Sequence, residues 1–381
     1  MRVSRRALLG RLGATAIAGS IPPTSFGFSK APLPVTAATA LEHPILLDRN
    51  ENAYGPSDKV LAALHDASAF GNRYARTEYD SLIAKIAGIH SVKPERIALA
   101  CGSSEILRLA AAEFLGPGKK LVQGSPTFPL LGRVARSAGM EVIDVPLRET
   151  GEHDLEAMLR SVRDSAGLVY ICNPNNPTGT LTPRREIEDF LHKLPAKTMV
   201  LIDEAYHHFV GNDVPSYASF LDHPVDDSRV MVARTFSKIY GLAGMRLGYV
   251  SATPEITRKF SAHQGYLGIS IVAVRAAGIA LDDVEYVRMG VKRNADDRQE
   301  FFNQVNGRMI HAFNSHTNFV LINPLRTADK VIEHLKNNNV LIAPPIPAMS
   351  KYVRVSLGTP SDMLEFWRVL DQLPVTEKTH M

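Results

Sequence analysis

The sequence predicts an α/β fold in which helices cover both faces of a mostly parallel sheet. From about residue 72 to residue 270, short apolar runs alternate with segments of helical spacing. This alternation is typical of strands joined by crossover helices, and runs that are apolar throughout are typical of strands buried on both faces. In such a sheet the loops at the carboxyl ends of the strands converge on one crevice, where a ligand site is expected.

The individual elements follow from these patterns. Helices are expected at 80–89 (DSLIAKIAGI) and 103–115 (SSEILRLAAAEFL), where apolar residues recur every three or four positions. The expected strands are RIALA (96–100), LVYIC (168–172), MVLID (199–203), VMVAR (230–234), NFVLIN (318–323) and YVRVSL (352–357). The predicted division is a leader at 1–40, an N-terminal arm at 41–71 that belongs to the small domain, a large domain at 72–275 and a small α+β domain at 276–381.

The charge pattern gives no reason to expect nucleic acid as a partner. The chain has 43 basic and 39 acidic residues, but five of the basic residues and none of the acidic ones lie before position 41. The remaining chain therefore has a net charge of −1. The excess of basic residues in the full chain therefore comes largely from the leader.

The first forty residues resemble a twin-arginine export signal. In MRVSRRALLGRLGATAIAGSIPP, Arg5 and Arg6 precede a weakly apolar run that is too short and too interrupted to span a bilayer stably. An A-x-A-like cleavage site follows at residues 38–40. We therefore expect a periplasmic protein that meets the twin-arginine translocase during export. An ordinary basic N-terminal helix is the alternative.

The segment ARTFSKIYGLAGMRLGYV (233–250) gives the strongest chemical signal. It places Lys238 beside the hydroxyls of Thr235 and Ser237 and ahead of Arg246, in apolar, Gly-rich sequence. Burial and nearby cations make a lysine amine lose its proton and so become a nucleophile toward carbonyls. Hydroxyls and an arginine supply the donors that a phosphate ester needs. The combination points to a Schiff base with pyridoxal phosphate, and a solvated surface lysine is the alternative.

Three other segments support this interpretation, each an apolar run that ends in turn residues: ALACGSSEILRLAA (98–111), VYICNPNNPTG (169–179) and VLIDEAYHHF (200–209). With the lysine segment, and in this order, they resemble the fold-type I aminotransferases of class I/II, and most closely the histidinol-phosphate aminotransferase branch. The resemblance runs from LDRNENAYGPSDKV at 47 to YVRVSLGTP at 352. It implies a seven-stranded type of large-domain sheet and pyridoxal 5′-phosphate as the cofactor.

The resemblance also implies roles for individual residues. Lys238 would attach the cofactor and act as a base, and Asp203 would pair with the ring nitrogen. Tyr206 and Asn176 would donate to the phenolate oxygen of the ring. The implied phosphate-binding residues are Gly102, Ser103, Ser104, Thr235, Ser237 and Arg246. Phe128 would stack on the ring, and Tyr74 would reach the phosphate of a neighbouring subunit; for both, a place in the core is the alternative.

On the substrate side, Arg354 matches an arginine that binds the α-carboxylate, and Tyr54 and Asn176 are expected nearby. One position departs from the branch. In NNNVLIAPPIPAMSKYVR (337–354), Ala343 or a nearby proline stands where the branch usually has an arginine that binds the substrate's phosphate. Alanine offers neither charge nor donor, so histidinol phosphate is not the expected substrate. Lys351 is the alternative cation.

The sequence thus predicts an exported aminotransferase that moves an amino group between an amino acid and a 2-oxo acid and works as a homodimer. The alternatives are histidinol-phosphate aminotransferase proper, a decarboxylase, lyase or siderophore-tailoring enzyme on the same cofactor, and a non-catalytic relative. No metal is expected, because His207 and His208 would point to opposite faces of a strand without a carboxylate cluster beside them. Cys101 and Cys172 are expected to be free packing residues.

Overall fold

The computed structural model describes residues 44–162, 166–211, 214–263 and 268–373. The predicted leader and its cleavage site lie outside the described residues. Within the described ranges, no helix is long and apolar enough to cross a membrane.

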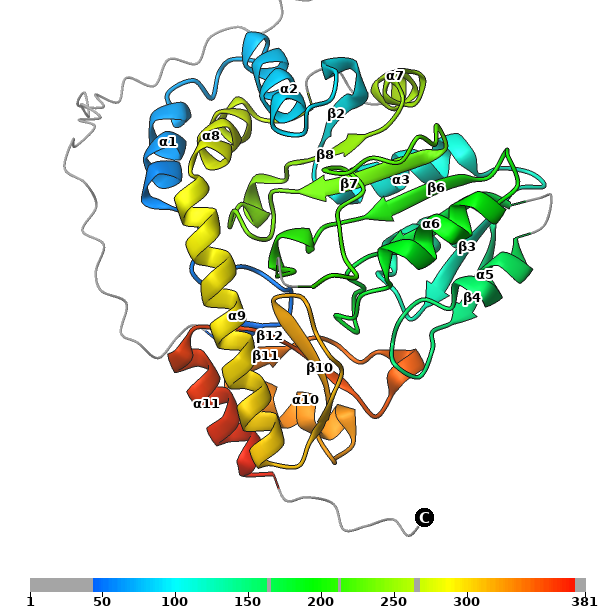
Figure 1. The fold of residues 1–381 in the computed structure, drawn as a ribbon. Helices are drawn as coiled ribbons and strands as arrows, with labels where there is room; N and C mark the ends of the chain where they lie inside the picture. The colour runs from blue at the N-terminus through cyan, green and yellow to red at the C-terminus, as the bar shows by residue number, and fades with distance from the viewer. Residues whose placement is uncertain (1–43, 163–165, 212–213, 264–267, 374–381) are drawn as a thin grey trace, which may run out of the picture. The chain divides into compact units, whose positions relative to one another are not determined.

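A seven-stranded sheet lies at the centre of the larger part of the fold (Figure 1). Its strand order is β2–β8–β7–β6–β5–β3–β4. Pairing is parallel from β7 through β4, and β8 pairs antiparallel with both of its neighbours, β2 and β7. The strands are β2 (Ile97–Ala100), β3 (Lys120–Ser125), β4 (Glu141–Pro146), β5 (Ala166–Cys172), β6 (Met199–Asp203), β7 (Val230–Thr235) and β8 (Gly248–Ser251). The predicted mostly parallel, seven-stranded sheet is confirmed.

Helices cover both faces of this sheet, because successive residues of its buried strands enter two different cores. In β5, Val169 and Ile171 belong to the core that includes residues of α2, α5, α6 and α8. Leu168, Tyr170 and Cys172 belong to the core formed with α3, α4 and α7. The helices are α1 (Asp58–Ser68), α2 (Thr77–Ile89), α3 (Ser103–Phe114), α4 (Leu130–Ser137), α5 (Leu155–Ser161), α6 (Arg184–Lys193), α7 (Pro254–His263) and α8 (Ile271–Asp282), with short 3-10 helices η2 (Pro94–Arg96), η3 (His207–Phe209) and η4 (Ala243–Met245).

A smaller α+β layer follows in the C-terminal part of the chain. Its strands β12, β10 and β9 form an antiparallel sheet, and β1 from the N-terminal arm pairs in parallel with β11. A third core fills this layer, with Phe301, Phe366 and Trp367 among its buried side chains. The elements are β1 (Ile45–Leu47), α9 (Val284–Gly307), β9 (His311–Ala312), β10 (Phe319–Asn323), α10 (Ala328–Asn337), β11 (Val340–Ile342), η5 (Pro347–Met349), β12 (Val353–Ser356) and α11 (Pro360–Asp371).

Two local predictions are wrong. β6 ends at Asp203, so His207 and His208 lie in the 3-10 helix η3 and not on a strand, and their ring centroids are 5.0 Å apart. Cys101 is exposed and therefore not a packing residue, although both cysteines are free and Cys172 is buried. No group of three or more residues suited to a metal ion occurs in the described part of the chain.

Candidate functional site

The carboxyl ends of three adjacent strands bring the predicted site residues together. The NPNNPTG turn with Asn176 follows β5, Asp203 ends β6, and Lys238 follows β7. Because β5, β6 and β7 pair in parallel register, these segments leave the sheet at the same edge. This is the edge at which an open α/β sheet is expected to bind its ligand.

Lys238 is held as a half-buried amine with a lowered proton affinity. Its Nζ donates to the main-chain oxygens of Arg49 at 3.0 Å and Asn50 at 2.8 Å. Burial, and then the positive charge of Arg354, lower the pKa of Lys238 to about 7. A large fraction of the amine is therefore neutral near pH 7 and able to attack a carbonyl.

Asp203 is a carboxylate buried at the end of β6, with 2% of its surface exposed. Its Oδ2 accepts from the Tyr170 hydroxyl at 3.0 Å and its Oδ1 from the main-chain N–H of Ala205 at 3.1 Å. Burial raises the pKa of Asp203 to about 6, against the effect of these two hydrogen bonds. A cationic partner would stabilise its charged form further. The sequence analysis missed Tyr170, although a tyrosine in an otherwise aliphatic buried strand needs a partner for its hydroxyl.

A chain of polar contacts connects Tyr206 to Arg354. The Tyr206 hydroxyl accepts from Asn50 Nδ2 at 3.0 Å and from Asn176 Nδ2 at 3.5 Å. Asn176 Oδ1 accepts from Arg354 Nη1 at 2.5 Å, and Arg354 Nη2 donates to the main-chain oxygen of Asp48 at 2.7 Å. Among the described residues, Arg354 Nε is buried and has no hydrogen-bond partner. An unpartnered buried guanidinium N–H is suited to a ligand carboxylate. Sequence reasoning missed Asn50, for which no local signal exists.

Several hydrogen-bond donors lie at the start of α3. Gly102 is the N-cap residue, has φ of 74°, and provides no capping side chain. A Cβ atom at Gly102 would lie only 2.5 Å from Arg246 Nη2, so this guanidinium packs against the bare backbone. Thr235 Oγ1 donates to Ser237 Oγ at 3.0 Å, and Arg246 Nη1 lies 3.4 Å from the same oxygen. The predicted phosphate-binding set of Gly102, Ser103, Ser104, Thr235, Ser237 and Arg246 thus surrounds a helix N-terminus.

Within the described residues, three predicted residues have side-chain contacts that lie away from the groups above, or none. Phe128 is half-buried and packs against the core beside α3 and α4. Tyr74 is 73% exposed. The Tyr54 hydroxyl donates to Asp297 Oδ2 at 2.9 Å on α9, and the guanidinium of Arg293 lies 4.2 Å from the centroid of its ring. Their roles in cofactor and substrate binding stay predictions.

Comparison with known proteins decides the family. Residues 42–370 match the family model for aminotransferase class I and II. The chain belongs to this family. The histidinol-phosphate aminotransferase of Caldicellulosiruptor saccharolyticus is 32% identical over 334 residues, which is 87% of this chain and 92% of that protein. That of Staphylococcus carnosus is 35% identical over 314 residues, or 82% and 86%. The crystal structure of the Sinorhizobium meliloti histidinol-phosphate aminotransferase in complex with pyridoxal-5′-phosphate has a TM-score of 0.81 and 27% identity, covering 87% of this chain and 92% of that one.

The protein is therefore an aminotransferase that uses pyridoxal phosphate, as the sequence predicted. Aminotransferases of this family act on amino acids and oxo acids and are typically dimeric. The residues present fit the cofactor. A buried carboxylate suits a protonated ring nitrogen, a lysine with a pKa of about 7 suits an aldehyde, and a helix N-terminus beside Arg246 suits a phosphate.

The assignment of Lys238 is tested by removing its amine. Lys238→Ala should abolish the cofactor adduct that borohydride traps in the wild-type enzyme, because no nucleophile remains at this place, while the far-ultraviolet circular dichroism stays unchanged. Mass spectrometry of the reduced, digested protein measures the adduct. Lys197→Ala, at an exposed position, is the matched control. Finding the reduced adduct on a different lysine would end the assignment.

Proposed function

We propose that the enzyme transfers the amino group of an ordinary amino acid to a 2-oxo acid, and that histidinol phosphate is a poor amino donor. One observation carries this proposal. Arg354 is present to bind a carboxylate, but the neighbouring residue 343 is an alanine. The main-chain N–H of Ala343 donates to the Arg354 main-chain oxygen at 3.2 Å, and its side chain is buried. The neighbour of the carboxylate site therefore offers no charge.

The chain's own residues supply the parts that amino transfer needs. Pyridoxal phosphate, when bound, supplies a carbonyl that takes up the amino group and a ring that withdraws electrons. Arg354 would bind the substrate α-carboxylate, and its unpartnered Nε supports that role. The Lys238 amine would accept the proton from the substrate Cα and return it, as a base with a pKa of about 7 can. Asp203 would keep a proton on the ring nitrogen.

The absence of an arginine at residue 343 is expected to weaken the binding of a substrate phosphate. Losing a hydrogen bond to a charged group costs about 1.5–3 kcal/mol, which is roughly a factor of ten or more in affinity. Lys351, the alternative cation, is exposed. A donor with an uncharged or carboxylate side chain does not need the missing cation.

Histidinol-phosphate aminotransferase proper is the second candidate. It is supported by the names of the relatives from Caldicellulosiruptor saccharolyticus and Staphylococcus carnosus. It requires that a cation other than residue 343 binds the phosphate. A decarboxylase or lyase is less well supported, because Arg354 is suited to holding the carboxylate that a decarboxylase must release.

The proposed working unit is a homodimer whose active sites each receive Tyr74 from the other subunit. Support comes from a set of exposed apolar side chains close to Tyr74 in sequence or on the helices α1, α8 and α9. Leu61 is 50%, Phe70 42%, Tyr74 73% and Val284 68% exposed. α1 packs against α8, and α9 follows α8 directly in the chain. Burial of such side chains against a second copy would be favourable.

Export to the periplasm through the twin-arginine pathway is also proposed, on the basis of SRRALLG and the weakly apolar run after it. This pathway carries folded proteins, so the enzyme would bind its cofactor before export. A periplasmic location fits a substrate outside histidine biosynthesis.

Substrate choice is tested by comparing kcat/KM for histidinol phosphate and for glutamate, since this ratio reports discrimination in the transition state. The wild-type ratio should favour glutamate. Ala343→Arg should raise the value for histidinol phosphate about tenfold or more, because it restores a charged donor. Ala348→Arg, which adds the same charge at an exposed position, should leave it unchanged. Wild-type turnover of histidinol phosphate above that of every amino acid tested would contradict the proposal.

The shared active site is tested at Tyr74. Tyr74→Phe should weaken retention of the cofactor by about tenfold, because a hydroxyl donor to a phosphate is lost, without dissociating the dimer. Equilibrium dialysis measures the first effect and analytical ultracentrifugation the second. Tyr352→Phe is the control, since that ring packs on His311 and Phe313 instead. A fully active monomer at low concentration would refute the shared site.

Export is tested in a Gram-negative host with a twin-arginine system. Replacing both Arg5 and Arg6 by lysine in the full-length chain should retain the enzyme in the cytoplasmic fraction, because the pair is the recognised feature. Cell fractionation followed by immunoblotting measures the distribution, and Arg11→Lys serves as the control. Periplasmic enzyme at the wild-type level in the double variant would exclude this route.

A further inference from the structure

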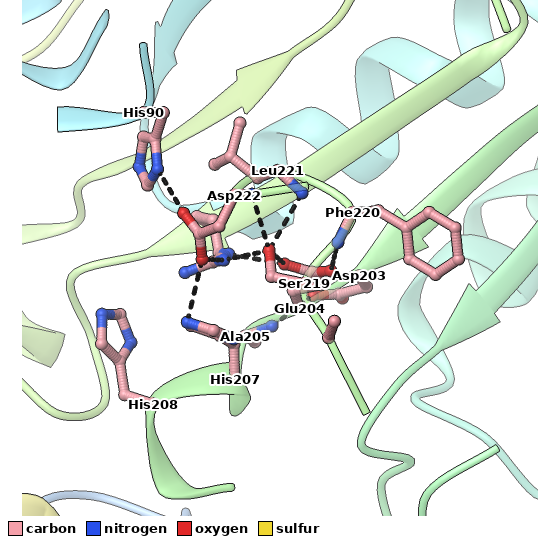
Figure 2. A network of polar contacts seen from close by, with 12 residues as sticks. His90, Asp203, Glu204, Ala205, His207, His208, Ser219, Phe220, Leu221 and Asp222 are labelled. Atoms are coloured by element: carbon pink, nitrogen blue, oxygen red, sulfur yellow. Dashed lines mark hydrogen bonds and ion pairs between the residues drawn. The ribbon is translucent and has the colours of Figure 1, made fainter. Parts of the chain in front are cut away.

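A second set of buried charged residues begins one residue after Asp203 and is separate from the cofactor-binding groups (Figure 2). Its centre is an ion pair between Glu204 and Arg234, whose side chains are 1% and 2% exposed. Arg234 Nε donates to Glu204 Oε2 at 2.8 Å. Neither side chain contacts Lys238 or the residues at the start of α3 through a hydrogen bond or ion pair within the described residues. The pair therefore has no direct part in the proposed chemistry.

The remaining hydrogen bonds of Glu204 come from one short segment. Ser219 Oγ donates to Glu204 Oε2 at 2.8 Å, and the main-chain N–H of Phe220 donates to Oε1 at 2.7 Å. Arg234 Nη2 donates to the same Ser219 oxygen at 2.7 Å and to Asp222 Oδ2 at 3.2 Å. Both carboxylate oxygens of Glu204 are thus satisfied, as a buried charge requires.

Asp222 extends the network toward α2 and η3. Figure 2 shows its carboxylate between His90 and His207. Its Oδ1 lies 2.6 Å from His90 Nδ1, and its Oδ2 lies 3.4 Å from His207 Nε2. Burial lowers the pKa of His207, and it lowers the pKa of His208 to about 3, so burial disfavours the charged form of both rings. Arg234 is therefore the cation that directly pairs with Glu204.

The main chain links this pair to the cofactor site. Asp203 and Glu204 are consecutive, and Arg234 directly precedes Thr235 of the phosphate-binding set. The Glu204 N–H donates to the Ala233 oxygen at 3.0 Å, which continues the pairing of β6 with β7. Neighbouring residues of an extended chain point to opposite faces. A side-chain bond between Glu204 and Arg234 on one face thus fixes how the segments carrying Asp203 and Thr235 lie on the other.

The charge of Glu204 also acts on Asp203. Burial is the largest cause of the raised pKa of Asp203, and the negative charge of Glu204 raises it further. The other titratable groups that face Asp203 come from all three neighbouring strand ends. They are Tyr170 and Cys172 from β5, Tyr206 after β6, and Lys238 after β7. Among the groups around Asp203, Glu204 is the added negative charge, and Arg234 is the cation that forms an ion pair with it.

We propose that the Glu204–Arg234 pair is a positioning pair, which holds Asp203 in place and shields it from the charge of Glu204, so that Asp203 stays ionised beside the ring nitrogen of the cofactor. The inference rests on the role proposed for Asp203 at that nitrogen. It assigns a function to two residues whose side chains form no hydrogen bond or ion pair with Lys238 or the start of α3 within the described residues.

Two single variants should act in opposite directions, which a purely structural role would not produce. Arg234→Gln leaves the charge of Glu204 unpaired, so it should raise the pH midpoint of the bound cofactor's absorbance change by about one unit and weaken cofactor affinity about tenfold. Glu204→Gln removes the negative charge and should lower the midpoint. The double variant with both glutamines should return affinity to within about threefold of the wild type.

The measurements are an absorbance titration of the holoenzyme between about pH 5 and 9 and equilibrium dialysis of pyridoxal phosphate, with circular dichroism to confirm folding. Arg229→Gln is the matched control, because Arg229 pairs with Asp227 just before the other end of β7 and should leave both readouts unchanged. If Arg234→Gln does not fold, the direction of the Glu204→Gln shift carries the test.

Asp203→Asn, measured in parallel, distinguishes a failure of the role proposed for Asp203 from a failure of the role proposed for the Glu204–Arg234 pair. If Asp203→Asn changes the titration but Arg234→Gln and Glu204→Gln do not, or if both shift it in the same direction, the positioning pair is refuted and the role of Asp203 stands. If Asp203→Asn also leaves the titration unchanged, the role of Asp203 and the inference built on it both fail.

Discussion

The site depends on one constraint, the burial of a carboxylate at the end of β6. Asp203 receives two hydrogen bonds, from the Tyr170 hydroxyl and the Ala205 N–H, and its pKa is still raised to about 6. A cation beside Asp203 would stabilise its carboxylate. Lys238 is a weak candidate for this cation, because burial lowers the pKa of Lys238 to about 7. A protonated ring nitrogen would supply the charge. The same burial thus makes the lysine a nucleophile and the aspartate a partner for a cationic ring.

The two faces of β6 and β7 carry different sets of polar residues. One set is proposed to contact the cofactor, and the other lies behind it. One face carries Asp203 and Thr235, which we propose to hold the cofactor, and Asp203 there has a raised pKa. The other encloses Glu204 and Arg234, where the hydrogen bonds are complete within the protein. Incomplete pairing is costly in a low-dielectric interior unless a ligand completes it, and complete pairing gives rigidity. The fully hydrogen-bonded Glu204–Arg234 pair can thus hold in place the strand ends that carry Asp203 and Thr235.

Within the described residues, Arg354, the residue proposed to bind the substrate carboxylate, also has an unsatisfied hydrogen-bond donor. Arg354 is anchored by Asn176 and by the main chain at Asp48, which leaves its Nε for a ligand. Ala343 lies against the same strand and offers no donor of its own. Family membership therefore establishes the reaction and the cofactor, whereas the preferred amino donor is a proposal that rests on Arg354 and Ala343.

The sequence by itself determined the features that leave a local pattern. Apolar runs ending in turns marked β5, β6 and β7, and the short motifs after them contained Asn176, Asp203 and Lys238, because each motif is continuous along the chain. Only the tertiary structure decided the rest. Asn50 reaches Tyr206 across 156 positions and Tyr54 reaches Asp297 across 243, and contacts between such distant segments leave no periodicity to read. The 3-10 helix at His207 and His208 is likewise accompanied by contacts to distant segments, of His207 with Asp222 and Tyr217 and of His208 with Tyr240.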